Sequence, residues 1–73
     1  MTYRATEFSS VLTQEQRTAE ARRIVREMGL ENYLEQMTPA ARSMIEQNAD
    51  DDFERVSIKQ LFWMRDLKDK FLL

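Results

Sequence analysis

The side chains that most often carry out catalysis or bind transition metals are missing from this sequence. It contains no cysteine and no histidine, so the usual zinc ligands, the thiol nucleophile and the side chain that titrates near neutral pH are all absent. Its densest carboxylate group, Asp50-Asp51-Asp52, lacks the alternating ligands, central glycine and distal glutamate of an EF-hand calcium loop. The sequence therefore predicts a protein that is not an enzyme and that uses no metal and no cofactor.

The arginines Arg22, Arg23 and Arg26 form a concentrated group of positive charge in the first half of the sequence. Arg22 and Arg26 stand four residues apart, so on an isolated helix they repel each other slightly. An acidic partner or a phosphate group would explain why they are placed together. A solvated face on which Glu20 and Glu27 balance the arginines also explains them. We keep the three arginines as candidate binding residues and leave both explanations open.

The segment from Val56 to Leu73 contains the only tryptophan and a dense run of large apolar residues. At about 100° per residue, these residues fall on two faces of a helix rather than on one. Such a helix lies either at the centre of its domain or between its domain and a partner. The wider and less interrupted face, which we expect to form the core, consists of Trp63, Met64, Leu67 and Phe71. The second face consists of Ile58, Leu61, Phe62 and Leu72, with Arg65 and Asp69 in its middle.

The second face has the composition of a binding surface. A charged pair among apolar residues is typical of a partly buried interface whose geometry the charges help to set. We therefore expect the following residues to contact a partner: Ile58, Phe62, Arg65, Asp69 and Leu72.

Two helix starts are specified by capping boxes, in which each of two residues accepts, through a side-chain oxygen, a hydrogen bond from the backbone amide of the other. Thr13 followed by Gln16 has the required spacing, and Ser57 followed by Gln60 has it again. The sequence therefore predicts helices that begin next to Thr13 and Ser57.

The helix ends and breaks also have chemical causes. Gly29 predicts a helix end in the left-handed conformation, and Pro39 predicts a new helix whose cap is Thr38. Residues 48–55 are the most polar connection in the chain, and we expect them to form a solvated linker. The prediction is an all-α small bundle of about four helices with a long C-terminal helix. It forms a single domain of residues 1–73, with an arm over 1–12 and helices over 13–28, 30–37, 39–48 and 57–72.

Length and charge limit the kinds of partner. A chain of 73 residues buries only about 60% of the surface that its unfolded form exposes, so its core is marginal and a partner or second copy is a common remedy. The net charge of −2 offers no general attraction to nucleic acid or to an anionic membrane. The N-terminus lacks the apolar region of a signal peptide, and no stretch approaches the ~20 apolar residues of a membrane span. We expect a cytoplasmic protein that does not bind membranes.

The segments 30–37 and 39–48 form a corner that allows a helix-turn-helix hypothesis. The turn between them has no glycine, and the acidic residues 50–52 follow directly, where a surface bound to phosphates would be repelled. We do not expect nucleic acid to be the partner, although a small DNA-binding regulator stays an alternative. The hypothetical base-reading residues are Ala40, Arg42, Ser43, Gln47 and Asn48.

The C-terminal pattern Ser57-x-Lys59-Gln60-x-x-Trp63-x-Arg65-x-Leu67 resembles a segment of small phage- and prophage-encoded accessory proteins. In these proteins a Ser/Thr-x-Lys-Gln start leads into a helix with a central tryptophan. The resemblance covers about a quarter of the chain. It implies an accessory protein of a mobile element that binds a host or phage protein, in the host cytoplasm.

These observations predict a non-catalytic protein-binding module, in the manner of a phage-type inhibitor or modulator of a host protein complex. The partner is then another protein of the host or phage, or a second copy of the chain. A DNA-binding regulator and a structural homodimer remain as alternatives.

The two faces of the last helix should separate stability from recognition. Leu67→Ala is expected to cost roughly 2–5 kcal/mol, enough to unfold a domain this small. Phe62→Ala or Arg65→Glu should leave the helicity nearly unchanged and weaken self-association or partner binding. Thermal melting, combined with sedimentation or pull-down, measures both properties. The two faces are assigned backwards if Phe62→Ala unfolds the protein while Leu67→Ala melts like the parent.

Overall fold

The computed structural model describes residues 12–72, and every regular element in this part of the chain is a helix. The all-α class and the long C-terminal helix are therefore confirmed. Of the arm expected over residues 1–12, only Leu12 is among the described residues, and it is partly buried against the core. The elements are α2 (Gln14–Arg22), the π-helical turn η1 (Arg23–Glu27), the 3-10 helix η2 (Leu30–Gln36), α3 (Pro39–Ala49) and α4 (Ile58–Leu72).

Both predicted capping boxes are formed. Thr13 Oγ1 accepts a hydrogen bond from Gln16 N at 3.1 Å, and Thr13 N donates to Gln16 Oε1 at 2.9 Å. The same reciprocal pair joins Ser57 and Gln60 at 3.1 and 3.0 Å. Each box satisfies backbone amides that have no partner within the helix, so these two starts follow directly from local sequence.

Gly29 ends the first helix in the left-handed conformation that the sequence predicts, with φ +89°. The helix widens before it stops, because Met28 N donates to Arg23 O, five residues earlier, at 2.8 Å. The next segment is a 3-10 helix, in which residues three apart stand over each other. Leu30 and Tyr33 therefore share one side, where Leu30 is buried and Tyr33 stacks on Phe71 of α4 with ring centroids 5.6 Å apart.

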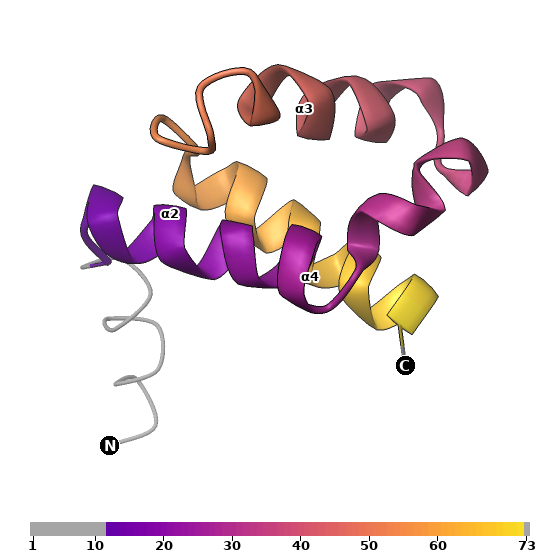
Figure 1. Ribbon diagram of the computed structural model, residues 1–73, viewed down its shortest axis with the longest axis horizontal. Coiled ribbons are helices and arrows are strands. Elements are labelled where there is room, and N and C mark those ends of the chain that lie inside the picture. Colours follow the sequence, from indigo (N-terminus) through magenta and orange to yellow (C-terminus); the bar gives the residue numbers. More distant parts are fainter. Residues whose placement is uncertain (1–11, 73) are drawn as a thin grey trace.

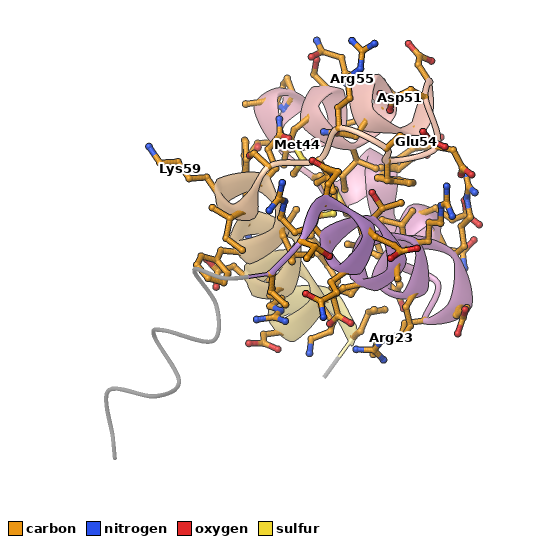
Figure 2. All side chains as sticks on the ribbon, turned by 90° about the vertical axis from the view of Figure 1, so that its left-hand side faces the viewer. Arg23, Met44, Asp51, Glu54, Arg55 and Lys59 are labelled. Carbon is orange, nitrogen blue, oxygen red and sulfur yellow. The ribbon has the colours of Figure 1, made fainter. Side chains whose placement is uncertain are left out.

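The helices enclose the core between two layers (Figure 1). The segment α2–η1 and helix α4 lie side by side and run in the same direction, and α3 crosses on the other side of the core. Met44 of α3 is buried and points into this interior (Figure 2). The buried apolar residues are Ala21, Ile24, Val25, Leu30, Met37, Ala41, Met44, Ile45, Phe53, Val56, Leu61, Met64 and Leu67.

The connection between α3 and α4 is not the solvated linker that we expected. Helix α3 ends in a Schellman pair, in which Phe53 N donates to Asn48 O at 2.8 Å and Asp52 N donates to Ala49 O at 3.0 Å. Asp52 and Phe53 both have positive φ, 60° and 65°. This conformation is unusual for a bulky residue and costs about 1–2 kcal/mol. Complete burial of the Phe53 ring, a contribution of roughly 1.5–3 kcal/mol, offsets it.

The side of α4 that faces the core also differs from the sequence prediction. Met64 and Leu67 are buried as expected, but Trp63 is 38% exposed and Leu61, from the other predicted face, is fully buried. The buried arc is centred on Met64 because α4 contacts α2, η1 and η2 together. It therefore includes parts of both predicted faces, and Trp63 lies beyond its edge.

Phe53 should contribute more to stability than any exposed ring. Phe53→Ala is expected to lower the free energy of unfolding by roughly 3–5 kcal/mol, a large part of the about 5–15 kcal/mol of a typical domain. Phe62→Ala is the matched control, because it removes the same atoms from a side chain that is 40% exposed. Urea unfolding followed by far-UV circular dichroism measures both. Equal losses in the two variants would contradict the anchoring role of Phe53.

Candidate functional site

Two large aromatic side chains stand next to each other on the outward side of α4. Phe62 is 40% exposed and Trp63 is 38% exposed. Lys59 lies one turn before them and Asp66 one turn after them, and both are exposed. Residues three and four apart are neighbours on a helix surface, so the four side chains form one continuous patch. We call Lys59, Phe62, Trp63 and Asp66 the aromatic face.

The charges at the two ends of the aromatic face are not used within the described part of the chain. Neither Lys59 nor Asp66 makes an ion pair with any residue among 12–72. Figure 2 shows Lys59 projecting from the start of α4 away from the other helices. A cation and an anion are therefore available on either side of the two rings.

Three other charged residues of α4 have neighbours of their own. Arg65 Nη2 lies 3.8 Å from Glu20 Oε2, and the Arg65 guanidinium carbon lies 5.8 Å from the centroid of the Phe62 ring. Lys68 Nζ lies 3.7 Å from Asp69 Oδ1. Arg65 is thus placed between the aromatic face and α2, where it both pairs with a carboxylate and covers one ring.

The structure brings together only part of the predicted partner-binding set. Phe62, Arg65 and Asp69 lie at the surface or near it, as a binding role requires. Ile58 and Leu72 are instead partly buried against the core. Trp63 is the residue that the sequence reasoning assigned to the core rather than to the site. Its exposure depends on how α4 is rotated, and a helical wheel with two apolar faces does not determine that rotation.

Each arginine of the cluster is paired with a carboxylate of the same chain. Arg22 Nη2 lies 2.9 Å from Asp52 Oδ2, and Arg26 Nη1 pairs with the other oxygen of the same carboxylate. Arg23 makes two hydrogen bonds to Glu20, at 3.0 and 3.1 Å. The like charges of Arg22 and Arg26 are therefore placed together by Asp52, from a part of the chain that lies 26 residues beyond Arg26. No phosphate or acidic partner is needed to explain them.

The corner of η2 and α3 has an acidic surface. A hollow of about 630 Å³ between these elements is lined by Glu31, Glu35 and Glu46 together with Arg42 and uncharged neighbours. Asn48, one of the hypothetical base readers, is buried and donates through Nδ2 to Met44 O at 2.9 Å. Its amide is therefore occupied inside the protein and cannot read a base edge.

We also looked for a metal site, a membrane-spanning helix and similarity to known proteins. Residues 12–72 contain no group of three or more acidic side chains arranged to hold a metal ion. None of the described helices has both the length and the apolar character that crossing a membrane requires. Comparison with protein-family models, with curated proteins and with solved structures found no match to this chain. The exposure of Phe62 and Trp63 side by side makes the aromatic face the candidate site that geometry supports best.

Glu20 should make the stability depend on pH. The hydrogen bonds from Arg23 lower the pKa of the Glu20 carboxyl from its usual value of 4.5, the positive charges of Arg65 and Lys68 act in the same direction, and partial burial opposes them. Because the pKa of Glu20 is lower in the folded state, its contribution to stability is complete above the ordinary pKa of 4.5. The contribution is lost as the pH falls through the folded pKa.

Glu20→Gln is therefore expected to destabilise the protein near neutral pH, and its difference from the wild type should shrink as the pH is lowered. Urea unfolding midpoints measured from neutral pH to about pH 3 test this. In an Arg23→Ala background the same substitution should show a smaller pH dependence, because the first cause of the shift has been removed. A difference between wild type and Glu20→Gln that stays constant across this range would contradict the prediction.

Proposed function

We propose that this protein is a non-catalytic protein-binding module and that the aromatic face of α4 is its binding surface. The observation that carries the proposal is the exposure of two adjacent rings, Phe62 and Trp63, on a helix whose opposite side is buried at Leu61 and Met64. Tryptophan and other aromatic residues are enriched at the centres of protein interfaces. A helix with its inner side packed in the core presents such rings at low cost in conformational entropy.

The energetics of the face suit association. Removing an exposed apolar side chain from water contributes roughly 1.5–3 kcal/mol when burial is complete, and Phe62 and Trp63 each have part of this still available. Lys59 and Asp66 add charges of opposite sign at the two ends of the patch. Charges in such positions mainly set orientation and partner choice. The arrangement corresponds to a helix face that a partner groove or helix covers.

The resemblance of the C-terminal segment to phage- and prophage-encoded accessory proteins supports a more specific form of the proposal. The protein then acts in the host cytoplasm as an inhibitor or modulator of a protein complex. The helices serve as a small bundle that holds α4 in place. The absence of cysteine and histidine agrees with a function that needs no chemistry of its own. A DNA-binding role gains no support from the acidic surface at Glu31, Glu35 and Glu46.

The proposal predicts that binding depends on both rings and that folding does not. Phe62→Ala combined with Trp63→Ala should reduce the recovery of specific partner proteins in a quantitative pull-down by roughly tenfold or more, on the scale of interface hot spots. Met28→Ala is the matched control, because Met28 is a large apolar residue of similar exposure, 38%, that follows η1 and is not part of α4. Far-UV circular dichroism should be unchanged in all variants.

The single tryptophan gives a second readout that needs no label. Adding a purified partner should shift the emission of Trp63 to shorter wavelength and protect it from acrylamide, because the ring leaves water. A partner set that is recovered equally well by the double variant and by Met28→Ala would refute this use of the aromatic face.

A further inference from the structure

We propose that a second copy of this chain covers the aromatic face, with the two α4 helices antiparallel across a two-fold axis. The inference rests on the proposed function and names the partner of the same site. It comes from the order of the residues on the face and from the charges that the described chain leaves unpaired.

The aromatic face is complementary to itself when its direction is reversed. Lys59 precedes Phe62 by three residues, and Asp66 follows Trp63 by three residues. The centre of this pattern lies between the two rings. A two-fold axis at that point, perpendicular to α4, places Lys59 of each copy opposite Asp66 of the other. It also gathers the four aromatic rings at the middle, as in an isologous interface with an apolar centre and a charged rim.

A parallel pairing of the same faces is disfavoured by the same charges. It would place Lys59 against Lys59 and Asp66 against Asp66, and like charges that face each other across an interface suppress that arrangement. The sign of the two charges therefore selects the antiparallel orientation.

The two charges of the aromatic face are available to pair across an interface, whereas two neighbouring charges of α4 are engaged within the described residues. Arg65 is directed toward Glu20, at 3.8 Å, and Lys68 lies 3.7 Å from Asp69. Lys59 and Asp66 have no ion-pair partner among residues 12–72. The second copy supplies the opposite charge to each.

The size of the face sets the strength of the dimer. Helix α4 has 15 residues, which corresponds to a length of about 22 Å. One face of such a helix can bury less surface area than a standard interface, which buries about 800 Å² per partner. We therefore expect a reversible dimer with a dissociation constant in the micromolar range or weaker, rather than an obligate one.

The test uses charge reversals in the purified full chain, followed by sedimentation velocity from micromolar to millimolar concentration. Lys59→Asp makes both ends of the face acidic, and Asp66→Lys makes both ends basic. Each single variant should dimerise roughly tenfold more weakly, the scale for two exposed ion pairs that are replaced by repulsion. Mixing the two variants should restore association as a heterodimer, and the double variant Lys59→Asp/Asp66→Lys should dimerise like the wild type.

Glu46→Lys is the matched control, because it makes the same change in net charge as Asp66→Lys at an exposed position on α3. It should leave dimerisation unchanged. Protection of Trp63 from acrylamide with rising protein concentration gives an independent measure of the same equilibrium.

Two results would overturn the inference. A wild-type chain that stays monomeric up to millimolar concentration excludes the second copy as the partner. The antiparallel geometry is excluded if the two charge reversals do not weaken the dimer, or if mixing the two variants does not restore association. Either result leaves the pull-down through Phe62 and Trp63 as a separate test. The proposed function itself fails only if that pull-down is also insensitive to the two rings.

Discussion

The fold depends on the hydrogen bonds by which side chains of α2 hold the backbone of the loop before α4. Thr18 Oγ1 donates to the carbonyl of Phe53 at 2.6 Å, and both residues are buried. A buried carbonyl without a partner would cost about as much as a lost hydrogen bond, so this loop can pass under the surface only where α2 supplies donors. The flanking pairs are Gln14 Nε2 with Val56 O at 3.0 Å and Arg22 Nε with Asp52 O at 3.0 Å.

These contacts explain why the loop tolerates two successive residues with positive φ. Phe53 is held from both sides, since its carbonyl accepts from Thr18 and its ring lies under the Arg26 guanidinium, 5.5 Å from the ring centroid. The carboxylate of Asp52 pairs with Arg22 and Arg26. Surface ion pairs of this kind contribute at most about 1 kcal/mol each. The buried ring is therefore the larger stabilising contribution, and the arginines help to define the path of the loop.

Local chemistry predicted the parts of the fold that depend only on neighbours in sequence. The caps at Thr13, Thr38 and Ser57 and the left-handed Gly29 are all formed, because each involves groups within four residues. The anchoring of Phe53 could not be predicted in this way, since its partners lie on α2 and η1, 35 residues earlier in the case of Thr18. Phe62 was correctly kept out of the core, and Trp63 was not, because two apolar faces of similar size leave the rotation of a helix undetermined.

That rotation is set where the loop meets α4. Val56 is fully buried, and its carbonyl accepts from both Gln14 Nε2 at 3.0 Å and Arg17 Nε at 3.1 Å. The start of α4 is thereby fixed to α2 at one point, and the burial of Leu61 and Met64 then determines which side of the helix turns outward. The exposure of Phe62 and Trp63 is thus a consequence of contacts made elsewhere, so the surface proposed for recognition is distinct from the residues that hold it in position.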